Sequence, residues 1–449
     1  MKRSRAACAV LLVLFIGIES ADRSISAGPV YAEETAGNTG AQPAKAAGNW
    51  YDDLLFKDEN FIFEFIRAIG YAYEKGADIG ECVDTARRIK DSDDVSWYNE
   101  WLKTADRLFS FAQKMESEGD SVSAKEAYMR ASNYYRAAGF FLRTQDSLPK
   151  ALSSWKRSRE SFQKALAYMP DIERVSIPYM DTTLPGYFMK TANSKGKTPP
   201  LLIVHTGFDG TGEELYFEVG AAALSRGYNC LLFEGPGQGE VIRIQKIPFR
   251  YDWEKVVTPV VDYALARPDV DPDSIALMGI SMGGYLAPRA VAFEHRIKAC
   301  VANGGVYDFA ASLYNNLPDK LLVLVREDPE QFNAEIEKVM EKSAGIRWFF
   351  NNGMWTFQAS SPADFVIKMS DYTLKDVAGQ IRCDMLVIDG EGDVFLKGQG
   401  KKLYEALTCP KTYTLFTREE TAQAHCQAGS TAISNEIIFN WLDRVFVNA

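Results

Sequence analysis

Hydrophobic positions recur every three or four residues through residues 50–169, the spacing of amphipathic helices. Phe61, Phe65 and Ile69 mark one such face. Residues 124–168 predict a helical hairpin of a tetratricopeptide-like kind, although no second copy follows at a fixed period. We therefore expect an N-terminal helical module over residues 50–169 that packs on the next domain. A separate protein-binding scaffold is the alternative.

The pattern changes at Pro170, after which short apolar runs alternate with helix-length segments. This alternation predicts an α/β fold with a mostly parallel central sheet, covered by helices on both faces. The predicted strands lie at 173–180, 184–190, 201–205, 228–233, 274–279, 298–302, 385–388 and 412–416, and the predicted helices at 213–226, 253–266, 282–294 and 432–446.

Residues 307–380 interrupt this alternation with a long segment of helical character. The segment is rich in aromatic residues, among them Trp348, Phe349 and Trp355. An insertion between two sheet strands explains it most simply. We expect a helical cap within a domain that spans residues 170–449.

The first residues predict export. Lys2, Arg3 and Arg5 precede an apolar run at residues 9–18, which is too short for a bilayer span of about 20 residues. Small residues at 30–32 offer a cleavage site. We expect a signal peptide at 1–32, a flexible lead-in at 33–49, and a periplasmic or extracellular protein with no stable membrane span. An uncleaved anchor is the alternative.

Composition narrows the class of partner. The 449 residues are 47% hydrophobic and carry a formal net charge of -10, which suits a globular protein and argues against nucleic acid or anionic membrane. Seven cysteines show no disulfide framework, and no CxxC or histidine cluster indicates a metal. We expect buried thiols at Cys230, Cys300 and Cys383.

A strand-turn-helix pattern carries the candidate nucleophile. The predicted strand at 274–279, apolar from residue 275 to 278, runs into Gly279-Ile280-Ser281-Met282-Gly283, and a helical segment follows. So tight a turn needs neighbours with little side chain, which Gly279 and Gly283 supply. The turn exposes the Ser281 hydroxyl at the carboxyl edge of the sheet, at the N-terminus of a helix. A glycine-rich turn without catalysis is the alternative.

A serine hydroxyl needs a base to take its proton, and the sequence has three histidines. His295 lies in a charged context, and His205 ends an early strand, where we expect it to shape a loop. His425 lies between the last predicted strand and the closing helix. In sheets whose nucleophile lies on a strand-to-helix turn, the base has this place in the chain order. We expect His425 to be the base.

An acid must orient that base. Asp393 follows the strand at 385–388, and the order Ser281, Asp393, His425 fits the fold. Asp389 and Glu391 lie nearby and stay open as alternatives, as does Asp308 after an earlier strand.

The oxyanion formed during acyl transfer needs backbone N–H donors. One should come from Met282, the residue after the nucleophile. The other should come from the loop after the strand at 201–205, where we favour Phe208 with Gly207 as its neighbour. A plain turn is the alternative there. This chemistry needs no metal or organic cofactor.

On these motifs, residues 173–449 resemble an α/β-hydrolase. Phe233-Glu234-Gly235-Pro236-Gly237-Gln238-Gly239 is similar to the Asp-Gly-Pro-Gly-Gln-Gly segment of a subgroup with an N-terminal helical region. That subgroup includes dihydroxypseudooxynicotine hydrolase, the fungal polyketide-shortening pigment hydrolases and esterases of the fermentation-respiration-switch type. Glu234 stands where the subgroup usually has Asp. The resemblance implies hydrolysis of an ester, or of a carbon–carbon bond beside a ketone.

The resemblance also implies helices over the site beside the cap, closing an apolar pocket. Because the cap is aromatic, we expect a small-molecule substrate of apolar or aromatic character and place ester hydrolysis first. Cleavage of β-ketones is second. An acylaminoacyl-type peptidase is third, since the N-terminal region is helical where such enzymes carry a propeller. A binding scaffold with a decayed hydrolase domain is the alternative class, against which the intact set of Ser281, Asp393 and His425 argues.

Overall fold

The computed structural model describes residues 50–52, 54–193, 198–314 and 317–447. The predicted signal peptide at 1–32 and the lead-in at 33–49 lie outside the described residues. Residues 50–449 form one compact unit, in which the helical segment and the sheet belong together.

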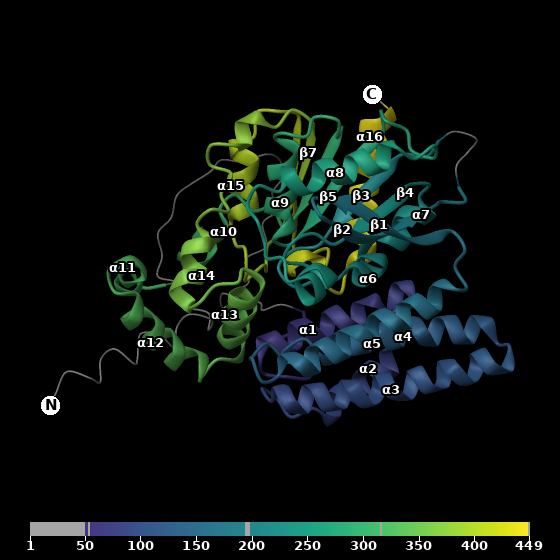
Figure 1. The fold of residues 1–449 in the computed structure, drawn as a ribbon, viewed down its shortest axis with the longest axis horizontal. Helices are drawn as coiled ribbons and strands as arrows, with labels where there is room; N and C mark the ends of the chain where they lie inside the picture. Colours follow the sequence, from purple (N-terminus) through teal and green to yellow (C-terminus); the bar gives the residue numbers. More distant parts are fainter. Residues whose placement is uncertain (1–49, 53, 194–197, 315–316, 448–449) are drawn as a thin grey trace, which may run out of the picture. The chain divides into compact units, whose positions relative to one another are not determined.

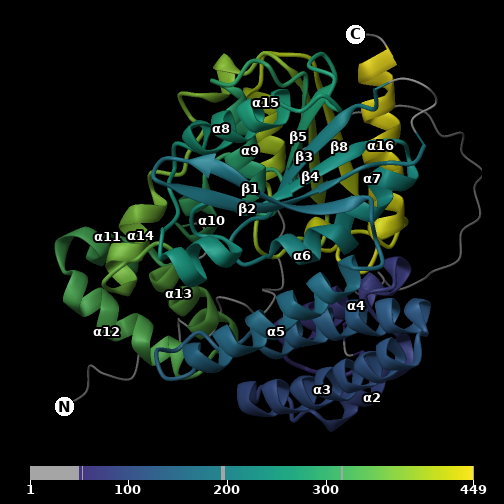
Figure 2. The ribbon, with the colours of Figure 1, turned by 45° about the vertical axis from the view of Figure 1, so that its right-hand side comes forward.

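The N-terminal module consists of helices packed side by side below the sheet in the view of Figure 2. Asp58, Asp78 and Asp93 each accept backbone N–H groups at a helix start, which satisfies amides that have no partner within the helix. Aromatic rings fill its core; Phe61, for example, stacks on Phe141 with centroids 4.6 Å apart. The elements are α1 (Glu59–Gly70), η2 (Tyr71–Glu74), α2 (Ile79–Arg88), α3 (Asp94–Glu118), α4 (Ser121–Ala138) and α5 (Leu148–Leu166).

The sheet is mostly parallel and confirms the predicted α/β class. Its order is β1-β2-β4-β3-β5-β6-β7-β8, with antiparallel pairing only where β2 meets β1 and β4. The central strands are buried along their whole length, as expected when helices cover both faces. The strands are β1 (Ile172–Tyr179), β2 (Thr182–Met189), β3 (Leu201–His205), β4 (Asn229–Phe233), β5 (Ile275–Ile280), β6 (Ala299–Asn303), β7 (Asp384–Gly390) and β8 (Lys411–Phe416).

Helices cover the two faces of this sheet (Figures 1 and 2). One face carries α8 (Glu254–Leu265), α9 (Gly283–Val291) and α15 (Gln399–Ala406), and the other carries α7 (Ala221–Ser225) and α16 (Thr431–Val447). The predicted helix at 213–226 is divided into α6 (Gly212–Leu215), a π-helical turn η3 (Tyr216–Gly220), and α7. A second π-helical turn, η4 (Val241–Gln245), follows β4.

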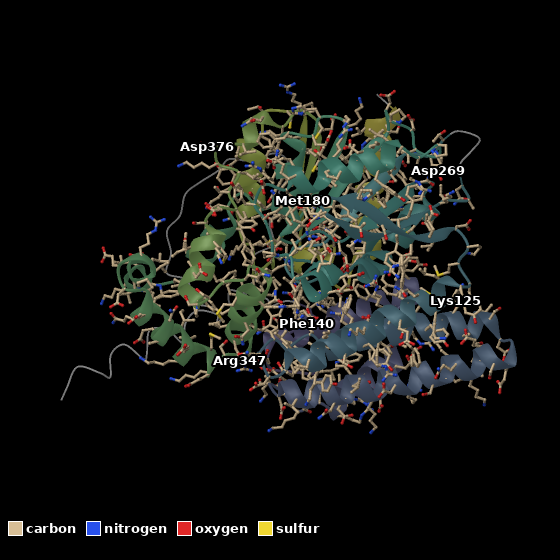
Figure 3. The ribbon with its side chains drawn as sticks, in the orientation of Figure 1. Lys125, Phe140, Met180, Asp269, Arg347 and Asp376 are labelled. Carbon is tan, nitrogen blue, oxygen red and sulfur yellow. The ribbon has the colours of Figure 1, made fainter. Side chains whose placement is uncertain are left out.

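The segment between β6 and β7 is helical and contacts the N-terminal module. The indole of Trp348 stacks on Phe140 at 4.7 Å and donates a hydrogen bond to the Phe140 carbonyl oxygen, and Arg347 pairs with Asp94 at 2.9 Å. Figure 3 shows Phe140 and Arg347 at this junction. The elements of this cap are α10 (Phe309–Tyr314), α11 (Asp319–Glu327), α12 (Pro329–Met340), α13 (Ala344–Thr356), α14 (Pro362–Met369) and η5 (Ala378–Gln380), followed by β7. No helix in the described part of the chain is long and apolar enough to cross a membrane.

Candidate active site

Ser281 lies at a tight turn between β5 and α9. Its φ is 62°, a left-handed conformation that costs free energy for a residue with a side chain and that gathers at functional sites. The turn holds because the Ser281 amide donates to the Asn303 carbonyl oxygen at 2.8 Å. A Cβ at Gly279 would collide with the carbonyl oxygen of Gly283, so the glycine spacing read from the sequence has a steric cause.

The structure brings the predicted nucleophile, base and acid together. The Ser281 Oγ lies 2.9 Å from His425 Nε2, and His425 Nδ1 lies 2.6 Å from Asp393 Oδ2. The other oxygen of Asp393 accepts the amides of Phe395 and Leu396 at 2.8 and 2.9 Å. A carboxylate only accepts hydrogen bonds, so Nδ1 donates to Asp393 and Nε2 of neutral His425 is free to accept the serine proton.

Burial and charge shift the pKa values of Asp393 and His425 in opposite directions. Burial alone would raise the pKa of Asp393, but the charge and the hydrogen bond of His425 hold that pKa below its ordinary value. Burial alone would lower the pKa of His425, but the Asp393 carboxylate raises it well above the ordinary value. The acid therefore stays ionised while the base titrates.

The alternative acids and histidines are engaged elsewhere. Asp308 accepts the Ala311 amide at 2.9 Å, and Asp389 accepts the Tyr413 hydroxyl at 3.2 Å. Glu391 accepts the amide of Arg418. His295 is exposed, whereas His205 is buried with Nδ1 3.0 Å from the Thr206 carbonyl oxygen.

The loop after β3 lies close against the Ser281 turn. A Cβ at Gly207 would lie 2.6 Å from the Met282 amide nitrogen and 2.6 Å from the Ile280 carbonyl oxygen, so only glycine permits this approach. The amides of Met282 and Phe208 have no hydrogen-bond acceptor among the described residues. Buried amides without a partner are rare, and these two are available to an oxyanion.

The segment similar to Asp-Gly-Pro-Gly-Gln-Gly braces this loop, a role that the sequence alone did not indicate. Gln238 Nε2 donates to the Thr206 carbonyl oxygen at 2.6 Å. Glu234 accepts the amides of Gly212 and Glu240 at 2.7 and 2.6 Å. Glu234 thus joins the start of α6 to the residue just before η4.

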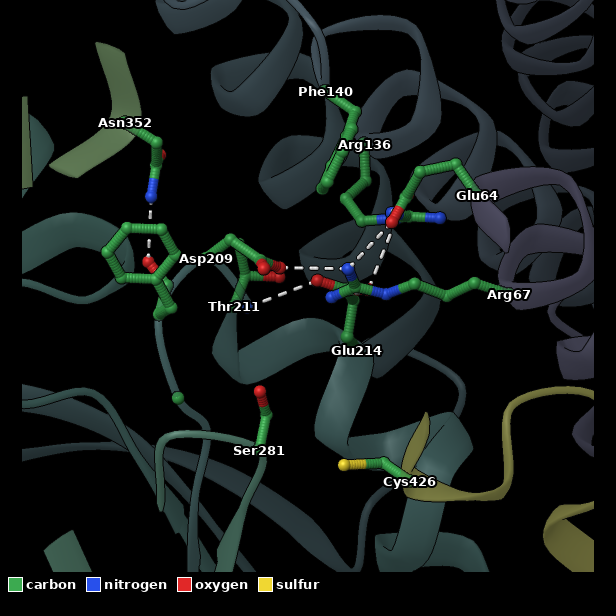
Figure 4. Close-up of polar contacts among 12 residues, drawn as sticks. Glu64, Arg67, Arg136, Phe140, Asp209, Thr211, Glu214, Ser281, Asn352 and Cys426 are labelled. Carbon is green, nitrogen blue, oxygen red and sulfur yellow. Dashed lines mark hydrogen bonds and ion pairs between the residues drawn. The ribbon is translucent and has the colours of Figure 1, made fainter. Parts of the chain in front are cut away.

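A network of buried charges joins the N-terminal module to the same loop (Figure 4). Arg67 of α1 pairs with Asp209 at 2.8 Å and with Glu214 at 3.0 Å. Glu64 pairs with both Arg67 and Arg136, at 3.1 and 2.9 Å. In Figure 4 the hydroxyl of Ser281 points toward this network. The ion pairs between the module and this loop could not be read from the sequence, because their partners are far apart along the chain.

A cavity of about 70 Å³ connects Ser281 and His425 to the module. Its apolar wall includes Phe63, Phe208, Met278 and Ile280, while Arg67, Tyr71, Asp209 and Glu218 supply polar groups. None of the described residues that line this cavity belongs to the cap. Aromatic rings of the cap pack on Phe208, which belongs to this wall, as Phe349 does at 5.6 Å.

The cysteines differ in how deeply they are buried. Cys230 and Cys300 are buried thiols, whereas Cys383 is only half-buried. Cys426, next to His425, lines the cavity and lies with Sγ 3.4 Å from His425 Nε2. Within the described segments no group of three or more His, Cys, Asp or Glu side chains is placed to hold a metal ion.

The chain belongs to the α/β hydrolase family, as the sheet order and the turn at Ser281 indicate. Residues 201–412 match the model of the alpha/beta hydrolase family. The chain is 34% identical over 412 residues to the 20-hydroxy-prefusarin hydrolase FUS2 of Gibberella moniliformis, an alignment that covers 87% of this chain and 98% of that protein. It is 35% identical over 424 residues to the alpha/beta hydrolase psoB of Aspergillus fumigatus, covering 87% and 94%.

A solved structure shares the fold. The crystal structure of 2,6-dihydroxy-pseudo-oxynicotine hydrolase superimposes with a TM-score of 0.67 at 20% identity, covering 84% of this chain and 96% of the other. The relatives at 34 and 35% identity, which are covered almost entirely, show that the protein is a hydrolase of the subgroup that the sequence indicated, and an enzyme.

Proposed function

We propose that this enzyme is a serine hydrolase that forms an acyl-enzyme at Ser281. The observation that carries the proposal is the contact of Ser281 Oγ with His425 Nε2 at 2.9 Å. On the other side of the ring, His425 Nδ1 lies 2.6 Å from Asp393 Oδ2. Such an arrangement of nucleophile, base and orienting acid is recognised by its geometry.

In this account His425 takes the proton of Ser281 as the oxygen attacks a substrate carbonyl. The amides of Met282 and Phe208 stabilise the oxyanion, and Asp393 stabilises the imidazolium. His425 then returns the proton to the leaving group. Water, activated by His425 in turn, releases the acyl group from Ser281.

The substrate that we propose is a small ester with an apolar or aromatic acyl group. Phe63, Phe208, Met278 and Ile280 on the cavity wall support an apolar acyl group. The cavity volume of about 70 Å³ supports a small acyl group. Carbon–carbon cleavage is the second candidate, and the partly buried carboxyl of Glu218 in the same cavity favours it.

A fluorophosphonate probe tests the nucleophile directly. The wild-type enzyme should be labelled and Ser281→Ala should not. Ser274→Ala is the matched control, because Ser274 hydrogen-bonds Asp271 near the opposite end of β5 and should be labelled like the wild type. Equal labelling of Ser281→Ala and the wild type would contradict the proposal, and a wild type that is never labelled would favour the binding scaffold.

We also propose that residues 1–32 direct export, on the strength of the charged start, the apolar run at 9–18 and the small residues at 30–32. Intact-mass analysis of protein collected outside the cytoplasm should give a chain that starts near Glu33. A chain that stays with the cytoplasmic fraction would contradict export.

A further inference from the structure

A ladder of alternating guanidinium groups and aromatic rings crosses the junction of the N-terminal module, the cap and the hydrolase domain. At its centre, the guanidinium carbons of Arg143 and Arg243 lie 5.6 and 5.3 Å from the ring centroid of Trp355. Neighbouring members of the ladder are 5.3 to 5.8 Å apart, measured from guanidinium carbon to ring centroid, and their order is Arg67, Phe140, Arg143, Trp355, Arg243, Trp155 and Arg159. Each guanidinium is attracted to the faces of its neighbouring rings.

The two ends of this ladder are paired with carboxylates. Arg67 pairs with Asp209 at 2.8 Å, and Arg159 pairs with Glu240. The cations at the ends are therefore balanced by charges of the protein itself.

The two middle cations have neutral partners. Arg143 is buried, and it donates to the side-chain oxygen of Asn352 at 2.9 Å and to backbone carbonyl oxygens, among them that of Gly139 at 2.8 Å. Arg243 is half-buried and donates to the Gly239 carbonyl oxygen at 3.0 Å. Among the described residues no carboxylate lies within ion-pair distance of either guanidinium.

Burial works against both charges. Burial and the charge of Arg243 lower the pKa of Arg143 to about 9, and burial also lowers the pKa of Arg243. An arginine does not give up its proton inside a protein, so these two like charges lack a counter-charge. The carboxylates that act on Arg243 without overcoming burial are those of Glu234, Glu213, Glu214 and Asp209.

A cavity of about 20 Å³ is lined by both of these arginines and by Trp155. The Trp155 indole is buried, and its Nε1 has no hydrogen-bond partner among the described residues. The cavity has room for one particle about as large as a water molecule or slightly larger. Its other charged groups belong to the ion-paired network described above and are Arg136, Asp209 and Glu214. The groups that remain to bind a ligand here are N–H donors, two of them cationic.

We propose that Arg143 and Arg243 bind one small monovalent anion, of the size of chloride or formate, in this cavity. Hydrogen bonds between a cationic donor and an anion are the strong kind, and the anion supplies the counter-charge that the two arginines lack. Arg143 follows α4 of the module, whereas Arg243 lies on η4 of the hydrolase domain. A shared anion therefore holds the two parts together.

The cap takes part in the same junction. Asn352 accepts from Arg143 and donates to the carbonyl oxygen of Phe208 at 3.1 Å (Figure 4). The anion site thus borders the Phe208 loop from the side of the cap. Binding of the anion is independent of whether Ser281 acts as a nucleophile.

Thermal unfolding at constant ionic strength tests the site. Potassium chloride or potassium formate replaces potassium gluconate, whose anion is too large for the cavity. Between about 1 and 100 mM of the small anion, the unfolding temperature of the wild type should rise by about 2 to 4 °C, because a ligand that binds only the folded state stabilises it.

Arg243→Gln should abolish this rise. The variant should still fold, because it removes one of two like charges that have no carboxylate partner. Arg107→Gln is the matched control, since Arg107 is an exposed residue of α3 that does not line the cavity, and it should respond like the wild type. An equal rise in Arg243→Gln and the wild type, or no rise in the wild type, would overturn the proposal.

Crystals grown in bromide give the position of the anion without any variant. The anomalous peak should lie within hydrogen-bonding distance of the guanidinium groups of Arg143 and Arg243 and of Trp155 Nε1. A map without a peak there would overturn the proposal. A peak without any rise of the unfolding temperature in solution would mean binding at crystal concentration only, which would also overturn it.

Discussion

The guanidinium of Arg67 lies 2.8 Å from the carboxylate of Asp209, and this pair joins helix α1 of the N-terminal module to the loop that carries Phe208. Arg67 also lines the cavity that contains Ser281. Asn352 of the cap holds the same loop from another direction, donating to the Phe208 carbonyl oxygen at 3.1 Å while it accepts from Arg143 at 2.9 Å. The module and the cap thus both position the loop that faces the nucleophile.

Arg67→Ala should destabilise the enzyme and reduce its activity together. Asp209, Glu64 and Glu214 would each lose a cation in a buried network, and removing one partner of such a network typically costs about 3 kcal/mol or more. Urea unfolding should show this loss, and kcat/KM for a p-nitrophenyl ester should fall because the Phe208 loop loses its anchor.

Arg107→Ala is the matched control for that substitution. Arg107 is exposed and pairs weakly with Glu81 at 3.6 Å, and surface pairs contribute roughly 0 to 1 kcal/mol. If Arg67→Ala has the same urea unfolding curve and the same kcat/KM as Arg107→Ala, the network does not position the loop.

Gly207→Ala should reduce kcat while the protein remains folded. The added methyl group would lie 2.6 Å from the Met282 amide nitrogen, so the Phe208 loop must move away from Ser281. Misplacing one oxyanion donor costs roughly 100- to 1000-fold in kcat. Gly379→Ala is the control, because no atom lies within 4 Å of the position its methyl group would take. If Gly207→Ala has the same kcat as the wild type, this loop does not bind the oxyanion.

The rate of ester hydrolysis should fall as the pH is lowered. His425 must be neutral to accept the serine proton, and Asp393 raises its pKa well above the ordinary 6.5. The kcat/KM value should therefore rise with pH to a plateau, with a midpoint above 6.5. Asp393→Asn removes the charge that raises this pKa, so the midpoint of the pH profile should move to lower pH. The kcat of this variant should also fall, by roughly 10⁴-fold, as in other serine enzymes. A wild-type midpoint below 6.5 would contradict the pairing.

The sheet and the proximity of Ser281, Asp393 and His425 could be predicted because their signals are local. The strand predicted at 201–205 is β3 (Leu201–His205), since a strand buried on both faces is a nearly continuous apolar run, here preceded by Pro199 and Pro200. Ser281 was marked by its flanking glycines. His425 was marked by its place after the last strand, and only three histidines competed for the role.

The wall of the site could not be predicted, because it depends on contacts between distant segments. Arg67 and Asp209 are 142 positions apart, and Tyr71 and Glu218 are 147 apart. Each of these side chains looks like an ordinary polar residue on a helix or loop. The aromatic residues of the cap were expected beside the pocket, and the rings of Trp348 and Phe349 pack on Phe208 of its wall.

Trapping the acyl-enzyme tests the central claim most directly. The enzyme is mixed with p-nitrophenyl acetate, quenched in acid within the first turnover, digested and analysed by mass spectrometry. We predict one acetyl group on the peptide that contains Ser281, and none on that peptide in Ser281→Ala. Full ester turnover by Ser281→Ala, or acetyl groups only on other peptides of the wild type, would contradict the account.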